Sequence, residues 1–235
     1  MKLTQGLAAV GLSLAAMAAS AEVTGTVGVY SDYNWRGITQ TSQDPALQGS
    51  IDYAHDSGFY AGVWASNVDF GDCCDENIET DIYLGFSGGE TVTWDFGGVY
   101  YLYPGAEDID FWEIYAGLGY NWLSGKLSYS SDFANYDETA LYFELNGEWE
   151  LPANFGLNAH VGYSDGDGIK LAYGEDSYFD WAVGVSYTLG HFDLGLKYAD
   201  GSDLEALDGT PGDVGSSEGV AIFSISTTFP WSAEE

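Results

Sequence analysis

The chain has 235 residues, of which 46% are hydrophobic, 16% aromatic and 18% charged. Its 5 Lys and Arg against 37 Asp and Glu give a formal net charge of −32, which excludes nucleic acid and anionic lipid headgroups as partners, because both are bound by clustered basic residues. The aromatic content excludes disorder. The many Gly, Tyr, Trp, Thr and Val residues suit strands better than helices, so the composition predicts an all-β protein.

Residues 1–21 have the pattern of a secretory signal peptide. Lys2 precedes an apolar run from Leu7 to Ala19, and Ala19-Ser20-Ala21 supplies the small residues of a cleavage site. The run is too short for a membrane anchor, which needs about 20 apolar residues. We predict export and cleavage after Ala21, leaving a mature chain that begins at Glu22.

From Glu22 onward, apolar and polar residues alternate with a period of two, the period of a β-strand. The alternation is clearest where Leu141, Phe143 and Leu145 interleave with Tyr142 and Glu144. Most segments are long enough for a tilted strand that crosses a bilayer in about 9–11 residues. Twelve strands are predicted, near 22–36, 46–55, 59–69, 79–87, 91–103, 111–122, 126–134, 139–151, 156–164, 178–189, 192–199 and 219–229.

The connections between these segments alternate between short turns and long, acidic loops, as in outer-membrane barrels. We therefore predict a transmembrane antiparallel β-barrel of about 12 strands over residues 22–229, with short periplasmic turns, longer acidic extracellular loops and a short tail at 230–235. The even strand count places both ends of the barrel on the periplasmic side. A secreted sandwich or soluble barrel with its apolar faces inward is the alternative.

Two observations favour the membrane barrel over the soluble alternative. Nearly every strand charge falls on the face opposite the apolar residues, and a charge facing lipid at mid-membrane costs about 2–4 kcal/mol. Aromatic residues of the apolar face also gather near both strand ends, as two interfacial girdles do. The predicted girdles are Tyr33, Trp35, Trp112, Phe133, Tyr163, Phe179 and Tyr198 near the long loops, and Tyr53, Phe59, Trp122, Trp149, Tyr187, Phe192 and Phe229 near the short turns.

The polar parity assigns ten acids and three basic residues to the lumen. This surplus predicts cation selectivity, because charges of one sign inside low-dielectric walls attract counter-ions. Arg36 is expected near the external rim, paired with a neighbouring acid. The predicted pore-lining residues are Asp32, Arg36, Asp52, Asp81, Asp95, Glu113, Lys126, Glu144, Glu148, Glu150, Asp180, Asp193 and Lys197.

Residues 23–41, 45–55 and 58–71 resemble the TorF family of porin-like proteins, and the terminal stretch 221–229 resembles the aromatic-ended last strand that the outer-membrane assembly machinery reads. The resemblance implies a proteobacterial outer-membrane location and contributes no catalytic residues. Its implied partners are the lipid bilayer, the assembly machinery and small solutes. The tail at 230–235 departs from this pattern, because such barrels usually stop at the aromatic residue.

The sequence offers little support for enzyme or metal chemistry. The sequence contains three histidines but no Gly-x-Ser-x-Gly motif that would supply a nucleophilic serine; the histidines are His55, His160 and His191. We predict no enzyme, no cofactor and no dedicated metal site. Adjacent Cys73 and Cys74 suit a loop disulfide or free thiols better than a soft-metal site. The acidic loop at 165–176 lacks the full calcium-loop pattern, which leaves only loose binding of divalent cations open.

Two functions remain for the predicted barrel. The first is a channel for passive diffusion of small cationic or neutral solutes. The alternative is a structural or surface-interaction barrel with a plugged lumen, because Tyr30, Tyr101, Tyr115, Tyr142 and an inward Trp64 would fill much of a twelve-strand interior.

Overall fold

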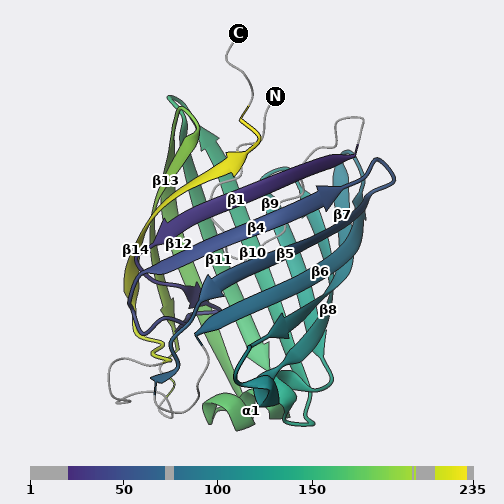
Figure 1. Cartoon of the computed structure of the whole chain (residues 1–235), viewed down its shortest axis with the longest axis vertical. Helices are drawn as coiled ribbons and strands as arrows, with labels where there is room; N and C mark the ends of the chain where they lie inside the picture. The colour runs from purple at the N-terminus through teal and green to yellow at the C-terminus, as the bar shows by residue number, and fades with distance from the viewer. Residues whose placement is uncertain (1–20, 72–76, 203, 205–214, 232–235) are drawn as a thin grey trace.

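Twelve long strands close into a single antiparallel barrel in the computed structural model, which describes residues 21–71, 77–202, 204 and 215–231 (Figure 1). The predicted signal peptide, Cys73, Cys74 and the end of the tail lie outside the described residues. Among these residues, no helix is both long and apolar enough to cross a bilayer.

The strands follow one another around the barrel in chain order, and β14 pairs with β1 to close it, with Gly25 opposite Phe229. The prediction of a closed twelve-strand antiparallel barrel is therefore confirmed. The barrel strands are β1 (Glu22–Tyr30), β4 (Ala46–Ala54), β5 (Phe59–Asn67), β6 (Ile78–Gly88), β7 (Val92–Leu102), β8 (Phe111–Tyr120), β9 (Leu123–Ser130), β10 (Ala140–Leu151), β11 (Phe155–Asp165), β12 (Ser177–Leu189), β13 (Phe192–Gly201) and β14 (Val220–Phe229).

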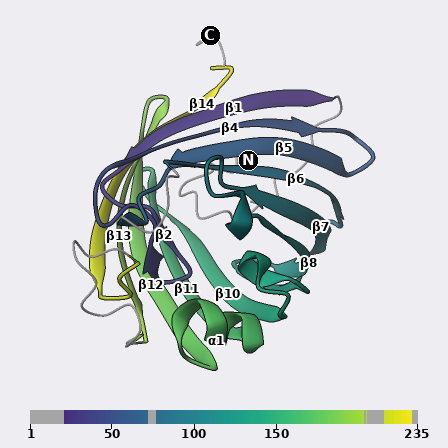
Figure 2. The ribbon, with the colours of Figure 1, turned by 60° about the horizontal axis from the view of Figure 1, so that its bottom comes forward.

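The two ends of the barrel differ in their connections. At the short-turn end lie residues 55–58, 89–91, 121–122, 152–154 and 190–191, together with the start of β1 and the end of β14 (Figure 1). At the opposite, long-loop end, the connections carry α1 (Asp167–Tyr173), η2 (Glu107–Ile109) and η3 (Phe133–Asn135). Seen from that end, α1 lies at the rim and β2 (Asn34–Trp35) lies inside the ring of strands (Figure 2).

The first strand is shorter than the sequence predicts. β1 ends at Tyr30, and the chain then turns inward to form a small hairpin of β2 and β3 (Ile38–Thr39) instead of continuing to residue 36. Arg36 and Gly37 form the hairpin turn with φ values of 49° and 81°, a backbone region in which glycine carries no steric penalty. We call residues 31–45 the inward segment.

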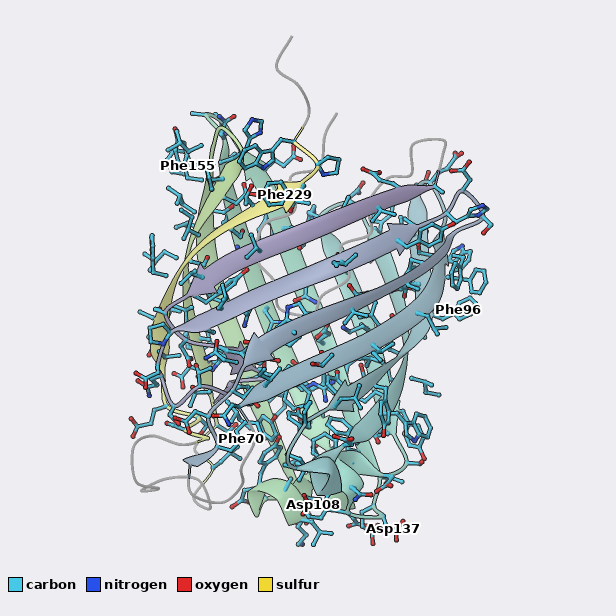
Figure 3. All side chains as sticks on the ribbon, in the orientation of Figure 1. Phe70, Phe96, Asp108, Asp137, Phe155 and Phe229 are labelled. Carbon is cyan, nitrogen blue, oxygen red and sulfur yellow. The ribbon has the colours of Figure 1, made fainter. Side chains whose placement is uncertain are left out.

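The outside of the barrel is an apolar belt. Leu145 is 38% exposed and Val183 is 47% exposed, and Phe96 points away from the barrel (Figure 3). Trp112, Phe179 and Tyr198 lie exposed on the outside as expected. The apolar residues thus surround the barrel where a soluble protein would bury them, the arrangement expected of a face that contacts hydrocarbon.

Three aromatic residues assigned to the outer girdle lie inside instead. Tyr33 and Trp35 belong to the inward segment, so their parity no longer follows that of β1. Phe133 is almost fully buried in η3, where its ring packs 4.9 Å from Phe111 and 6.4 Å from Trp35. The girdle prediction is wrong at these positions, because alternation cannot detect where a strand ends and the chain folds back.

Candidate functional site: the barrel lumen

Arg36, at the turn of the inward segment, joins this segment to the far wall. Its two terminal nitrogens donate to the two carboxylate oxygens of Glu113 on β8, at 2.8 and 2.7 Å. The guanidinium also stacks between the rings of Trp35 and Tyr142, at 4.2 and 4.1 Å from their centres. A paired and stacked guanidinium of this kind holds the hairpin in one place.

The local environment keeps Arg36 charged. Burial is the largest single influence and lowers the pKa of the guanidinium, but the charge and hydrogen bonds of Glu113 together with Tyr101 and Tyr142 outweigh it, so the pKa lies well above its ordinary value. The turn also packs closely against β12, because a Cβ added at Gly37 would lie 2.6 Å from the Cβ of Asp180. The sequence predicts Arg36 near the external rim with an acid partner, and Glu113 is that partner. The structure puts Arg36 inside the barrel, because the inward segment carries it there.

The start of the inward segment is fixed by a second acid. Asp32 is buried and accepts hydrogen bonds from the hydroxyls of Thr39 and Thr41, the latter at 3.1 Å. Burial raises the pKa of Asp32, while the two hydroxyls and the charge of Lys197 oppose that rise. Asp32 therefore fastens the first and last parts of the segment to each other.

Aromatic side chains fill the half of the lumen nearer the long loops, which we call the long-loop half. Tyr33 packs on Trp64 with ring centres 5.3 Å apart, and Tyr101 stacks on Phe111 at 4.4 Å. All four are buried. Together with Phe133 they form a core inside the barrel, so this half is packed like the interior of a globular protein.

Two acids lie within this packed half. Glu79 accepts a hydrogen bond from Tyr33 at 3.1 Å, and the neighbouring Asp81 is 0% exposed. Among the described residues, no donor reaches either oxygen of Asp81. Glu79 is missing from the predicted pore-lining residues, although it lies two positions before Asp81 on the same strand face. The alternation that identified Asp81 was sufficient to find it.

Toward the short turns the lumen opens, as β10 shows along a single strand. Tyr142 is 3% exposed and the side chain of Glu144 is 13% exposed, whereas Glu148 and Glu150 are exposed. All four residues lie on the same face of the strand, because they are separated by even spacings. We call the lumen of this half the vestibule. Its exposed carboxylates face solvent inside the barrel.

Hydrogen-bonded groups lie between the packed half and the vestibule. His160 contacts Asp180 at 2.8 Å and Asn146 at 2.6 Å, and Lys126 pairs with Glu144 at 3.2 Å. Hydroxyl groups also hold other carboxylates of the lumen. On β4 to β7, Tyr60 donates to Asp95 at 2.7 Å and Tyr83 donates to Asp52, and on β12 and β13 Thr188 donates to Asp193 at 2.6 Å.

The two sides of the lumen differ in the size of their side chains. The wall of β5 to β8 is lined by buried aromatic residues: Tyr60, Trp64, Tyr83, Tyr101, Phe111 and Tyr115. The wall of β12, β13, β14 and β1 carries small residues on its inner face: Gly184, Ser186, Thr188, Gly195, Ser224, Ser226, Thr26 and Gly28. The same wall also carries the larger, buried Tyr30, Tyr178 and Ile222, and we call it the small-residue wall.

The thirteen residues expected to line the pore have the inner strand parity or belong to the inward segment, and their surroundings differ. Glu113, Asp81 and Asp180 are buried in the packed half, and Glu148 and Glu150 are exposed in the vestibule. Of the three basic residues, Arg36 and Lys126 are in ion pairs and Lys197 is in none of those formed by the described residues. In the same part of the chain, no group of three His, Cys, Asp or Glu side chains is arranged to hold a metal ion.

The chain is a closed twelve-stranded β-barrel with an apolar outside and a charged inside, and solved porins have a similar fold. The NanC porin matches with a TM-score of 0.58 at 10% identity, over 89% of this chain and 100% of that chain. The KdgM porin matches with a TM-score of 0.54 at 8% identity, over 89% and 99%. At these identities the likeness concerns the fold.

The chain belongs to the family described as "Bacterial protein of unknown function (Gcw_chp)", whose model matches residues 15–229. That match covers the whole barrel. No curated protein sequence matches the chain. The resemblance to the TorF family stays a prediction, since the family match is to Gcw_chp.

Proposed function

We propose that this protein is an outer-membrane, porin-like channel for the passive diffusion of small cationic or neutral solutes. The main support for this proposal is the inverted polarity of the closed barrel, which exposes an apolar belt outside and keeps its charges inside. Such a surface suits lipid, and a charged lumen suits water and solutes. In this proposal the short turns face the periplasm, and export removes residues 1–21, consistent with β1 beginning at Glu22.

The charge of the lumen supports a preference for cations. Glu148 and Glu150 are exposed in the vestibule and Asp52 and Asp193 are half-buried there, whereas Lys126 is already paired with Glu144. A negative lumen between low-dielectric walls concentrates cations and repels anions. The KdgM porin has been captured with oligogalacturonate, a polyanion, and a lumen this acidic is unsuited to such a solute.

The partners of the proposed channel follow from its surfaces. The belt binds the lipid of the outer membrane, and β14 ends in Phe229 on the outer face, the kind of terminal residue that the assembly machinery reads. The acidic long loops suit loosely bound divalent cations, which prefer oxygen ligands.

A plugged structural barrel is the second candidate, and the packed long-loop half favours it. The inward segment, Tyr33, Trp64 and Tyr101 leave little free space at that level. A barrel closed in this way would still present its long loops to the outside of the cell as an interaction surface.

Ionic current through a planar bilayer separates the two candidates. The purified full-length mature chain is compared with a variant in which residues 33–40 are replaced by a short Gly-Ser linker. The channel proposal expects steady current from both proteins, and a larger current from the variant because the obstruction is gone. Current from the variant alone would favour the plugged barrel, and the folded state of each is checked by its resistance to SDS without heating.

A further inference from the structure

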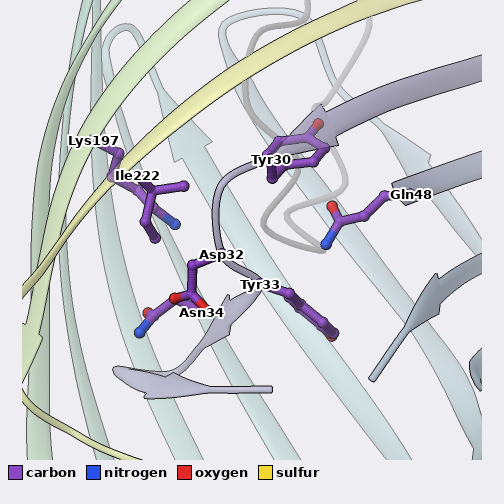
Figure 4. Close-up of a pocket in the computed structure, with 7 residues that line it drawn as sticks. All are labelled: Tyr30, Asp32, Tyr33, Asn34, Gln48, Lys197 and Ile222. Carbon is purple, nitrogen blue, oxygen red and sulfur yellow. The ribbon is translucent and has the colours of Figure 1, made fainter. Parts of the chain in front are cut away.

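A small polar pocket lies beside the inward segment, against the small-residue wall (Figure 4). It is lined by Asp32 and Asn34 of the inward segment, Gln48 of β4 and Lys197 of β13, together with Tyr30, Tyr33 and Ile222, and it has room for about one water molecule. Three polar atoms at this pocket, Asp32 Oδ2, Asn34 Nδ2 and Gln48 Oε1, have no hydrogen-bond partner among the described residues.

These three atoms show that the pocket is built for solvent. Asp32 is 3% exposed and Gln48 is 4% exposed, and buried polar groups are almost always satisfied by protein or by water. Two acceptors and one donor around a space of this size therefore indicate a hydrated point inside an otherwise packed half of the lumen.

The other flank of the inward segment is closed. There the guanidinium of Arg36 is clamped by Glu113 and stacked between Trp35 and Tyr142. Tyr101, Phe111 and Phe133 fill the space behind it. On the pocket flank, Tyr33 packs on Trp64, but none of the ion pairs formed by the described residues spans the pocket.

Lys197 lines the pocket from the small-residue wall. Lys197 lies opposite Gly184 of β12 and Ile222 of β14 in the strand register, two positions above Gly195. It is in no ion pair with a described residue. The ammonium group of Lys197 attracts anions and repels cations that pass between the vestibule and the pocket.

We propose that solutes pass the inward segment through this pocket, between Asp32 and Lys197, and that these two side chains determine which ions pass. This inference rests on the proposed channel function and deepens it by locating the constriction. In this proposal Lys197 lines the constriction, so its positive charge opposes the cation preference that the acids of the vestibule create. Arg36, though more central, lies off the route and acts only by holding the segment.

The test compares Lys197→Met with Lys126→Met, which removes the same charge four strands away around the barrel. Reversal potentials are measured in planar bilayers under a KCl gradient, together with Asp32→Asn. Lys197→Met should raise the ratio of potassium to chloride permeability by about threefold or more, Lys126→Met clearly less, and Asp32→Asn should lower it. Lys197→Gln repeats the measurement if the Met variant does not fold.

The outcomes distinguish the location of the constriction from the channel function itself. Equal shifts in Lys197→Met and Lys126→Met, with normal current in the unmodified protein, would overturn the location of the constriction and leave the channel function standing. An unmodified protein that passes no current would overturn the channel function and the inference together.

Discussion

The long-loop half of the lumen and the vestibule are built from the same twelve strands, with the same alternation of inner and outer residues. One is packed with rings and ion pairs, and the other carries the exposed carboxylates of β10 beside the buried group formed by Tyr60, Asp95 and Tyr115. The number of strands fixes the width of a barrel, whereas the residues inside the barrel determine the width of the passage, its bore. Here the bore is set by residues 31–45 and by the tyrosines and tryptophans that pack against them.

The charges of the two halves differ in the same way. In the long-loop half the guanidinium of Arg36 is buried and matched by Glu113, so it contributes to packing more than to the field that a solute meets. In the vestibule, Glu148 and Glu150 are exposed and are in no ion pair with a described residue. Ion selectivity therefore depends on the unpaired charges, and a count of all the acids overstates the expected preference for cations.

The largest expected effect is on the pair that closes the long-loop half. Glu113→Gln or Arg36→Met alone leaves one buried charge without its partner and should lower the free energy of unfolding by about 3–5 kcal/mol. The double variant should recover most of that loss, because neither charge remains. Urea unfolding in lipid vesicles, followed by tryptophan fluorescence, measures all three. Strictly additive single effects would show that the pair does not hold the inward segment.

The next effect separates the two faces of a single strand. Leu145→Arg places a charge in the apolar belt and should cost about 2–4 kcal/mol, enough to block folding into bilayers. Asn146→Arg, on the adjacent inner position beside Glu144, should fold nearly as the unmodified protein does. Folding yields in a bilayer-refolding assay compare the two variants. Equal yields would contradict the assignment of inner and outer faces.

A smaller effect is expected at the hairpin turn, with a matched glycine as control. Gly37→Ala combines a φ of 81° with a contact at 2.6 Å from Asp180, whereas Gly190→Ala has a φ of 62° and no atom within 4 Å. The strained backbone alone costs about 1–2 kcal/mol, so Gly190→Ala reports that cost and Gly37→Ala should exceed it. Unfolding free energies give the difference, and identical losses would mean that the turn is not packed against β12.

Alternation was enough to predict the barrel, because each strand has one face against the apolar surroundings and one against polar groups. The strand predicted over 139–151 spans Ala140–Leu151 for this reason. The same rule failed at Tyr33 and Trp35, where apolar residues continue the parity of β1 although the strand has ended at Tyr30. The dipeptide Arg36-Gly37 is the sequence feature that indicates a turn at this point.

The candidate site was predictable in its residues and not in its arrangement. Parity placed Glu113, Glu144 and Lys197 on the inner face. It carried no information on depth, so it could not separate the buried Glu113 from the exposed Glu148. The contact between Arg36 and Glu113 joins residues 77 positions apart, a separation that no local spacing rule reaches.

The smallest expected effect concerns the exposed acids of the vestibule. Glu148→Gln combined with Glu150→Gln should lower the cation preference slightly and change the unfolding free energy by no more than about 0.5 kcal/mol, as exposed surface substitutions do. Because Glu144 is tied to Lys126, it is left unchanged. Reversal potentials and urea unfolding of the same preparation measure both quantities. A marked loss of stability would show that these side chains have structural partners.

The reversal potential of the unmodified protein in a planar bilayer, under a KCl gradient at low salt, tests the proposed channel most directly. Low salt is chosen because screening shortens the reach of the lumen charges to about 10 Å at 0.1 M. A negative lumen with an open passage beside the inward segment predicts steady current and a reversal potential that favours potassium. A reversal potential that favours chloride, or the absence of any current, would contradict it.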